Sequence, residues 1–360
     1  MADSTRQLEF GLIRQTPLAP RFPTTRYQGS KRRLVEWIWD SVKQVSFDTA
    51  LDVFGGTGAV AYRLKQAGKQ VTYNDILAFN HAIGLALIEN NDIRLDDGEV
   101  EQLLKRDGSA EYGQFIADTF EGIYFTPAEN EWLDTIIQNI NRQLDNSYKR
   151  AVALFALYQA CMVKRPYNLF HRKNLYIREA NVERSFGNKR TWDTPFEDHY
   201  IKFVTEANAA IFDNGRLNTS LNIDALSISP QYDLVYIDPP YVNRQGVSVN
   251  YHEFYHFLEG LTLNDRWESL IDFKSKHRRL MPQPSPWNDK DRIHEAFRDL
   301  FAHFADSILV VSYRSDGIPS REELVAMLRK HKRTVVQAAL PQQYALSKNT
   351  SSRELLLIGI

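Results

Sequence analysis

The chain has 360 residues, of which 43% are hydrophobic, so it is long enough for about two domains and can bury a sizeable core. Its 44 Lys and Arg residues nearly balance 45 Asp and Glu residues, which gives a formal charge of -1 and no overall sign of a polyanionic partner. The longest nearly apolar run, residues 151–163, is too short to cross a bilayer, and a single cysteine cannot form an internal disulfide, so we expect a cytoplasmic protein without a membrane span.

The first part of the chain predicts a strand–helix–strand unit. A helix is expected over residues 31–43, followed by a strand at 50–54 that ends in a glycine-rich turn. A second helix should end near residue 67, and a second strand should cover residues 71–74. Short aliphatic runs that are bounded by turn residues and joined by such a helix are typical of a parallel sheet with helices on both faces.

The middle of the chain predicts a helical insertion. Between residues 85 and 147 there are 14 acidic and four basic residues, so this stretch should face water. Trp132, Ile136 and Ile140 recur at steps of four, which is the spacing of one face of a helix. We therefore expect residues 81–208 to form a mainly helical inserted domain.

The last part of the chain predicts further strands of the same sheet. Aliphatic runs at 233–237, 307–313, 334–339 and 354–358 are separated by helical stretches. Together with the first unit they predict an α/β fold. Residues 20–80 and 209–360 should form one discontinuous, Rossmann-like domain around the insertion.

A glycine-rich turn, Asp52-Val53-Phe54-Gly55-Gly56-Thr57-Gly58, follows the first predicted strand. Glycines allow a tight turn close to a ligand, and Asp75, at the end of the next strand, can accept hydrogen bonds from ribose hydroxyls. The pattern indicates an adenosine-containing cofactor, and Gly56, Gly58 and Ala61 also match the dinucleotide fingerprint. A turn without a ligand is the alternative, and the order of strand, glycines, helix and acid disfavours it.

A second motif, Asp238-Pro239-Pro240-Tyr241, follows the strand predicted at 233–237. It should lie at the carboxyl edge of the sheet, where open α/β folds bind their ligands. The prolines stiffen the turn, so the Pro239 carbonyl can act as a fixed acceptor beside the Asp238 carboxylate. Two such acceptors suit an exocyclic amine with two hydrogens, and Tyr241 is a candidate to stack on the ring that carries the amine.

Four segments together resemble a known family, the Dam-type, alpha-group (D12 class) DNA adenine-N6 methyltransferases. They are residues 26–31 (RYQGSK), 52–58, 238–241 and 312–317 (SYRSDG), in the order that the family has them. The resemblance implies a class I S-adenosylmethionine-dependent methyltransferase fold, with the insertion as the target-recognition domain. It implies transfer of a methyl group from S-adenosyl-L-methionine to N6 of an adenine flipped out of double-stranded DNA, without a metal ion.

The resemblance also implies roles for individual residues. Tyr27 and Lys31 are expected at the methionine end of the cofactor and Asp75 at its ribose. Asp224 is expected at the adenine amine of the cofactor, although a helix cap explains it almost as well. The glycine-rich turn and the second motif supply the other expected cofactor contacts, which are Asp52, Phe54, Gly55, Gly56, Gly58 and Asp238. The expected catalytic residues are Asp238, Pro239, Pro240 and Tyr241.

A basic stretch in the insertion predicts contact with DNA. Residues 161–192 contain eight basic and two acidic residues interleaved with aromatic ones, a composition that suits phosphates and exposed bases, although a solvated charged loop is the alternative. The basic residues are too many to be explained by Glu179 and Glu183 as local partners. The expected DNA-binding residues are Arg26, Lys164, Arg165, Arg172, Lys173, Lys189 and Arg190. The expected partners are double-stranded DNA and, in a restriction-modification system, a restriction endonuclease that acts separately.

Three other classes of protein would use some of these features. A nicotinamide-dependent oxidoreductase accounts for the glycines and Asp75 but leaves residues 238–241 and the basic stretch without a role. Among methyltransferases, one that modifies adenine N6 in RNA is disfavoured only by the resemblance, and those that modify protein glutamine favour Asn in place of Asp238. A non-catalytic DNA-binding module has no need for both the glycine-rich turn and Asp238.

Overall fold

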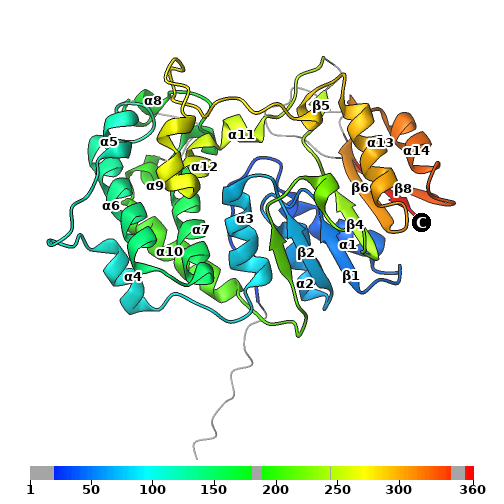
Figure 1. Cartoon of the computed structure of the whole chain (residues 1–360), viewed down its shortest axis with the longest axis horizontal. Coiled ribbons are helices and arrows are strands. Elements are labelled where there is room, and N and C mark those ends of the chain that lie inside the picture. The colour runs from blue at the N-terminus through cyan, green and yellow to red at the C-terminus, as the bar shows by residue number, and fades with distance from the viewer. Residues whose placement is uncertain (1–19, 181–188, 244, 342–352) are drawn as a thin grey trace, which may run out of the picture.

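The computed structural model describes residues 20–180, 189–243, 245–341 and 353–360, and a seven-stranded sheet forms its centre (Figure 1). The strands are β1 (Thr49–Asp52), β2 (Gln70–Asn74), β3 (Thr219–Leu221), β4 (Leu234–Ile237), β6 (Ile308–Arg314), β8 (Val335–Pro341) and β9 (Arg353–Gly359). Their order is β3-β2-β1-β4-β6-β9-β8, and all pairs are parallel except those of β9 with its two neighbours. The predicted α/β fold with a mostly parallel sheet is confirmed, whereas β3 is too short to have been recognised from its pattern.

The helices form two groups. Those next to the sheet are α1 (Val35–Val42), α2 (Ala59–Gln66), α3 (Ala78–Gly84), α13 (Ile293–His303) and α14 (Arg321–Leu328). Those of the helical part are α4 (Asp97–Leu104), α5 (Phe115–Thr119), α6 (Pro127–Gln143), α7 (Ser147–Val163), α8 (Leu175–Glu179), α9 (Lys189–Asp193) and α10 (Phe196–Ala210). After β4 come a two-stranded pair of β5 (Val242–Asn243) with β7 (Gly317–Ile318), and the helices α11 (Tyr251–Phe254) and α12 (His256–Leu263).

Alternate residues of the strands face opposite layers of helices. Ala50 of β1 and Tyr236 of β4 belong to the buried cluster that includes side chains of α1 and α2. Leu51 and Val235 belong to the cluster that includes side chains of α13 and α14. Because successive side chains of a strand point to opposite faces, covering both faces requires strands that are apolar throughout. The carboxyl edge of the sheet is left for the turns that carry the two motifs.

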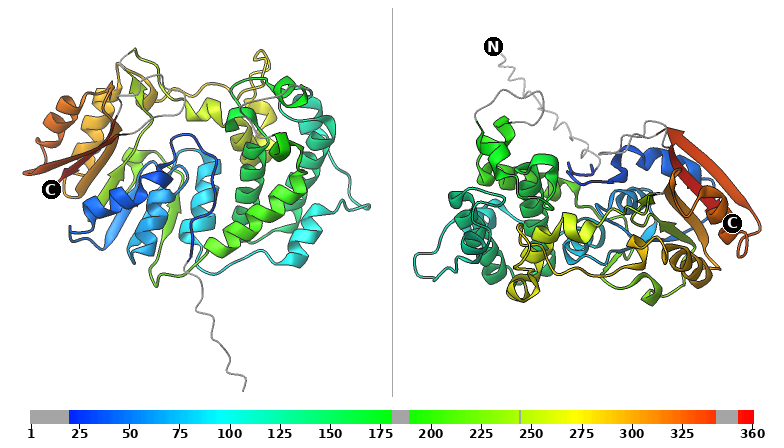
Figure 2. Two further views of the ribbon diagram at one scale, coloured as in Figure 1. Left: turned by 180° about the vertical axis from the view of Figure 1, so that it is seen from behind. Right: turned by 90° about the horizontal axis from the view of Figure 1, so that it is seen from above.

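The helical part lies beside the sheet, and α3 forms the border between them (Figures 1 and 2). One buried cluster runs from the sheet through α3 into α7, whose residues 151–163 are all buried. The predicted boundary at residue 81 falls within α3. In addition, α12 packs with the helical part although it follows β4, because Phe257 meets the rings of Phe120 and Tyr124. The division into a catalytic domain and an inserted domain stays a prediction.

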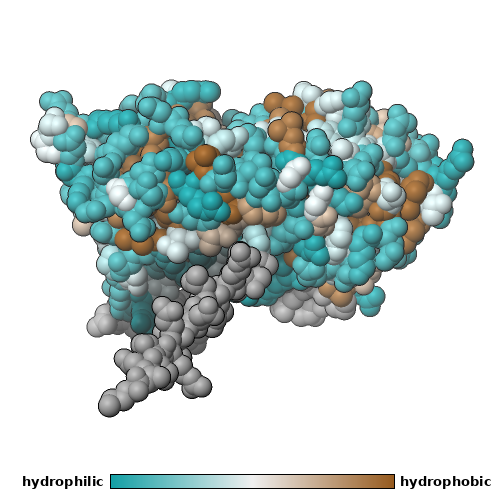
Figure 3. Space-filling model, turned by 90° about the horizontal axis from the view of Figure 1, so that it is seen from below, coloured by the Kyte–Doolittle hydropathy of each residue, from teal (hydrophilic) through white to brown (hydrophobic). Residues whose placement is uncertain are grey.

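One face of the protein is mainly polar. Hydrophilic side chains cover most of the face seen from below, and hydrophobic ones appear there in small separate groups (Figure 3). No helix within the described ranges is long and apolar enough to cross a membrane.

A buried ion cluster ties three helices of the helical part together. Glu129 of α6 lies 2.7 Å from Lys164 Nζ, at the end of α7, and 2.6 Å from Arg178 Nη2 of α8. Glu129 also closes a capping box with Thr126 at the start of α6. Burial alone would raise the pKa of Glu129, but the hydrogen bonds and charges of Arg178 and Lys164 outweigh it and hold the pKa below its ordinary value. The carboxylate therefore serves two buried cations at once.

Replacing Glu129→Gln should lower the free energy of unfolding by about 3–5 kcal/mol, because two buried cations lose their counter-charge. The contribution of Glu129 is present above the ordinary pKa of a glutamate and should be lost as pH falls through the lowered pKa. Urea unfolding at several pH values measures both effects. Glu131→Gln, at an exposed position of the same helix, is the control and should change stability by less than about 0.5 kcal/mol. Equal losses in the two variants would contradict the role of the cluster.

Candidate active site

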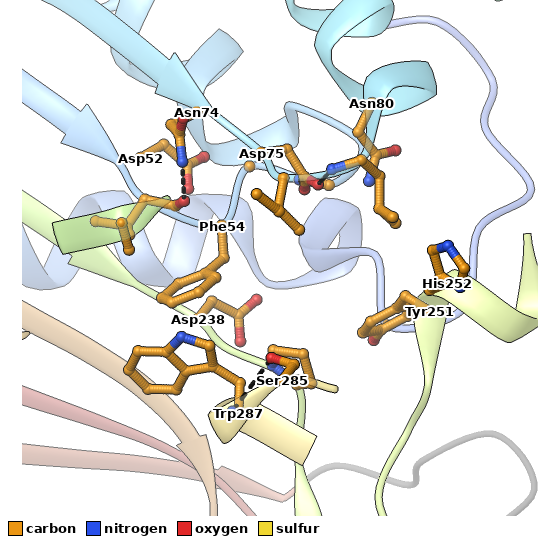
Figure 4. A pocket seen from close by; sticks show the side chains of 18 of the residues that line it. Asp52, Phe54, Asn74, Asp75, Asn80, Asp238, Tyr251, His252, Ser285 and Trp287 are labelled. Atoms are coloured by element: carbon orange, nitrogen blue, oxygen red, sulfur yellow. Dashed lines mark hydrogen bonds between the residues drawn. The ribbon is translucent and has the colours of Figure 1, made fainter. Parts of the chain in front are cut away.

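A cavity of about 350 Å³ lies at the carboxyl edge of the sheet, where β1, β2, β3 and β4 end. Figure 4 shows Asp52, Asp75 and Asp238 around its interior, with Tyr251 and His252 on one side. The predicted cofactor residues that line it are Tyr27, Lys31, Asp52, Phe54, Gly55, Gly56, Asp75, Asp224 and Asp238. Pro240 also lines the cavity, whereas Gly58, Pro239 and Tyr241 do not. Segments that are far apart in the sequence thus meet in one site.

The glycine-rich turn needs glycine for two different physical reasons. A Cβ atom on Gly55 would lie 2.0 Å from the ring of Tyr73, so no side chain fits there. Gly56 has a φ of +50°, a left-handed conformation that glycine adopts without strain. Its backbone N–H donates to Asp75 Oδ2 at 2.9 Å, and the other oxygen of Asp75 accepts from the N–H of Leu77 at 2.9 Å. Asp75 therefore braces the turn as well as facing the cavity.

Several buried acceptors of the cavity have no partner among the described residues. Asp52 is 1% exposed, and its Oδ1 accepts no hydrogen bond there, like Oδ1 of Asn80 and of Asn288. Burial, followed by the nearby charges of Asp238 and Asp75, raises the pKa of Asp52 well above its ordinary value. A ligand that brings N–H or O–H donors and positive charge would relieve these costs.

Two predicted cofactor residues also make structural contacts. Asp224 Oδ1 accepts from the N–H of Leu226 at 2.9 Å and caps the 3-10 helix Ala225–Ser227, so the helix cap is real and Asp224 lines the cavity as well. Tyr27 stacks on Tyr255 and on Tyr251, with ring centroids 4.5 and 5.5 Å away. The aromatic rings of Tyr27 and Tyr251 form part of the wall beside Asp238.

Lys31 is buried between two carboxylates. Its Nζ lies 2.8 Å from Asp238 Oδ1 and 3.3 Å from Glu354 Oε1, and it also donates to the hydroxyl of Tyr241. Burial alone would lower the pKa of Lys31, but the two carboxylates outweigh it and raise the pKa above its ordinary value. Burial raises the pKa of Asp238 to about 6, although Lys31 opposes the rise. The ammonium that was predicted to meet the cofactor is therefore engaged with Asp238, Tyr241 and Glu354.

The ring of Tyr241 does not face the cavity, which corrects the prediction that it stacks on the target ring. Tyr241 is 7% exposed and packs edge-on against Tyr313, with ring centroids 5.1 Å apart. Its hydroxyl oxygen lies 2.8 Å from Asp238 Oδ1 and 3.1 Å from Glu354 Oε1 and can donate its one proton to either of them, so the polar end is turned toward the ion pair. Other aromatic side chains line the cavity instead, among them Phe54 and Trp287 next to Asp238 and Tyr251 and His252 of α11.

The sequence reasoning missed two further parts of the site. The segment 283–288 forms one wall, and its Trp287 meets Phe54 edge-on with centroids 4.8 Å apart (Figure 4). Two prolines and a tryptophan in this short stretch were the available signal. Glu354 is the second residue of β9, after Arg353 and before an apolar run, and a carboxylate in that place was the signal for the second part.

The structure separates the predicted DNA-binding residues into two groups. Lys164 and Arg165 are 2% and 1% exposed, so they cannot reach a phosphate in this conformation, which corrects their assignment. Lys164 pairs with Glu129, which is distant in sequence, and Arg165 donates to backbone carbonyls of Tyr124, Leu169 and Arg172. Glu183, one of the expected local partners, lies outside the described residues. The exposed members are Arg26, Arg172, Lys173, Lys189 and Arg190.

Comparison with known proteins identifies the family. The sequence profile described as "D12 class N6 adenine-specific DNA methyltransferase" matches residues 27–310. The chain belongs to this family. The family resemblance predicted from the four sequence segments is therefore confirmed, and the D12-class membership excludes the oxidoreductase and the non-catalytic binding module.

Relatives of this D12-class methyltransferase carry type II names. The Type II methyltransferase M2.HphI of Haemophilus parahaemolyticus is 30% identical over 91% of this chain and 94% of its own length. The Type II methyltransferase M.FokI of Planomicrobium okeanokoites is 27% identical over 90% of this chain, which spans 48% of that longer protein. A solved structure, the rRNA methyltransferase aviRa from Streptomyces viridochromogenes, matches over 93% of this chain and 87% of its own chain with 13% sequence identity. Its TM-score of 0.29 is too low to support a comparison of the two folds.

Replacing Asp238→Ala should slow methyl transfer by about 10²- to 10³-fold, the usual cost of losing one preorganised electrostatic partner. In the wild-type enzyme the rate should also fall as pH drops below about 6, where Asp238 becomes protonated. Single-turnover rates across a pH series measure both effects. Asp233→Asn, at the opposite end of β4, is the control, because the hydrogen bonds found for the Asp233 side chain among the described residues come from Asp48 and Thr49, away from the cavity. A variant at Asp238 that keeps more than half of the wild-type rate removes this residue from catalysis.

Proposed function

We propose that the enzyme uses S-adenosyl-L-methionine to methylate N6 of an adenine that is flipped out of double-stranded DNA at a specific site. The observation that carries this proposal is the Asp238 carboxylate, which sits at the edge of the cavity with Oδ1 held by Lys31 and Tyr241. An acceptor that is fixed in this way suits the amino group of a base brought next to a methyl donor.

The residues of the cavity fit this cofactor. Asp52 Oδ1 is a buried acceptor that can take an ammonium donor, and Asp75 at the end of β2 suits ribose hydroxyls. Gly55 has no room for a side chain and Gly56 has a positive φ, so the turn carries no side chain at either position and a ligand can approach its backbone closely. The cofactor, when bound, supplies a methyl group activated by a sulfonium. Asp52, Asp75 and Asp238 would give a positively charged ligand a cavity lined by carboxylates.

The role of Asp238 follows from the chemistry of the adenine amine. The lone pair of this nitrogen is delocalised into the ring, and positive charge develops on the nitrogen as it attacks the methyl group. A carboxylate that accepts a hydrogen bond from the amine stabilises that charge, and its effect is large because the site is buried and the carboxylate is fixed in advance. Holding the two reactants together can contribute up to about 7–11 kcal/mol to the lowering of the barrier.

The adenine must leave the duplex to reach Asp238, because its N6 atom is paired inside the double helix. Unstacking a base costs a few kcal/mol, which stacking on aromatic side chains can offset. Tyr251 and His252 line the cavity and are placed for this contact. The exposed cations Arg172, Lys173, Lys189 and Arg190 are the candidates for phosphate contacts in the helical part.

The names of the relatives support a role in restriction and modification. M2.HphI and M.FokI are both named as type II methyltransferases. We infer that this enzyme protects DNA from a restriction endonuclease that acts separately. Expression in cells, followed by single-molecule sequencing of a plasmid, should detect N6-methyladenine at one recurring sequence. Plasmid DNA without modified adenine, from cells that contain folded protein, would contradict the proposal.

Replacing Asp75→Ala should weaken cofactor binding more than it slows the chemical step. The ribose contacts of Asp75 and its hydrogen bond from Gly56 stabilise the ground state and the transition state equally. Their loss should therefore raise the Michaelis constant for the cofactor and change saturated turnover little. Calorimetry and steady-state kinetics measure the two effects separately. An unchanged cofactor affinity would show that Asp75 does not hold the ribose.

Replacing Lys189→Ala together with Arg190→Ala should reduce the dependence of DNA affinity on salt. Each lost phosphate contact should lower the slope of log affinity against log salt by about 0.9. Binding to cognate and scrambled duplexes across a salt series measures the slope. Arg329→Ala with Lys330→Ala is the matched control, because these residues are also exposed and follow α14, at the opposite end of the molecule (Figure 1). The same slope in both double variants would place the DNA elsewhere.

A further inference from the structure

Glu354 is a buried carboxylate at the carboxyl edge of the sheet. It lies near the start of β9, opposite Arg314 of β6, and is 0% exposed. It does not line the cavity, so it has no direct access to a substrate or cofactor there. An ionised side chain in such a place is costly unless other groups compensate it.

Three groups that belong to different segments surround Glu354 Oε1. The hydroxyl of Ser312 on β6 donates to it, the hydroxyl of Tyr241 lies 3.1 Å away, and Lys31 Nζ lies 3.3 Å away. An ammonium has three N–H donors, and Lys31 meets three oxygens, those of Glu354, Asp238 and Tyr241. Glu354 therefore sets the position of two groups that both contact the catalytic carboxylate.

Both of these groups contact the same oxygen of Asp238. Among the described residues, the side-chain hydrogen bonds found for Asp238, from Lys31 and from Tyr241, end on Oδ1 at 2.8 Å. Figure 4 shows the Asp238 carboxylate directed into the space between Phe54 and Tyr251. Holding one oxygen fixes the direction of the other, Oδ2, which is left for the amine.

We propose that Glu354 is a positioning residue for methyl transfer, which holds Lys31 and the Tyr241 hydroxyl against Oδ1 of Asp238 so that Oδ2 faces the adenine amine. The inference rests on the proposed function, because it concerns the same Asp238. It extends the active site beyond the ends of β1, β2, β3 and β4 to the start of β9, where Glu354 is separated from Asp238 by more than a hundred residues.

The charges around Asp238 give this role a measurable consequence. The titratable groups that face it are Lys31, Asp52, Glu354, Tyr236, Tyr241, Tyr251 and Tyr313. Burial raises the pKa values of Tyr236, Tyr251 and Tyr313, so these three stay neutral at the pH of the reaction. The pKa of Asp238 is raised mainly by burial, lowered by Lys31 and raised by the like charge of Glu354. Removing the charge of Glu354 should therefore move the ionisation of Asp238 to lower pH.

Glu354→Gln tests the proposal, because the amide keeps an oxygen acceptor for Ser312 and Tyr241 but removes the charge. We expect single-turnover methylation to slow by about 10- to 100-fold at the pH optimum, since misplacing a reacting group by about 1 Å can cost about 10²-fold. The acid limb of the rate profile should shift to lower pH, and the Michaelis constant for S-adenosyl-L-methionine should change little.

Two further variants separate positioning from stability. Ser312→Ala keeps the charge of Glu354 but removes one hydrogen bond, so it should slow the reaction without moving the acid limb. Asp134→Asn is the matched control for losing a buried carboxylate, since the hydrogen bonds found for the Asp134 side chain among the described residues come from the N–H groups of Ile116 and Ala117 in the helical part. It should lower the melting temperature and leave the rate profile unchanged.

The outcomes distinguish this inference from the proposed function. A wild-type enzyme that methylates no adenine would overturn the function itself. An active wild type together with a folded Glu354→Gln variant that has the same rate and the same acid limb would overturn only the positioning role. A lower melting temperature with an unchanged rate profile would make Glu354 a structural residue, which also contradicts the proposal.

Discussion

The buried contact of Lys31 with Asp238 and Glu354 connects three segments on which the site depends. These segments are the N-terminal motif, the turn after β4 and the start of β9, and the sequence separates them widely. Two carboxylates and one ammonium can be buried together because each cation–anion contact offsets part of the desolvation cost. The cluster keeps one negative charge in excess, and in the proposed reaction this charge would face the positive charge that develops on the amine. The same three side chains would thus serve both the fold and the proposed chemistry.

The parallel sheet explains why the remaining site residues meet. Strands β1, β2 and β4 run in the same direction, so the residues that follow them, among them Asp75 and Asp238, emerge at one edge. The order of the strands places β1 between β2 and β4, so the glycine-rich turn after β1 lies between Asp75 and Asp238. The hydrogen bond from Gly56 to Asp75 then joins the turns after β1 and β2.

The sequence predicts the parts of the fold and site that depend on neighbouring residues. The strands that carry Asp52, Asp75 and Asp238 were recognisable from short apolar runs, and the turn at Gly55 and Gly56 from its composition. The burial of Lys164 could not be recognised from the sequence, because its partner Glu129 lies on another helix. The role of Glu354 depends on the antiparallel register of β9 on β6, which no local pattern encodes. The hydroxyl of Tyr241 points toward this same Glu354, so the orientation of Tyr241 could not be predicted from the local sequence either.

The most direct test of the proposed reaction is to incubate the purified enzyme with duplex DNA and S-adenosyl-L-methionine that carries a deuterated methyl group. Mass spectrometry of the digested DNA then identifies the labelled nucleoside. We expect labelled N6-methyldeoxyadenosine with the wild-type enzyme and nearly none with Asp238→Ala. Label on cytosine, or equal labelling by the two enzymes, would contradict methylation of adenine N6 at Asp238.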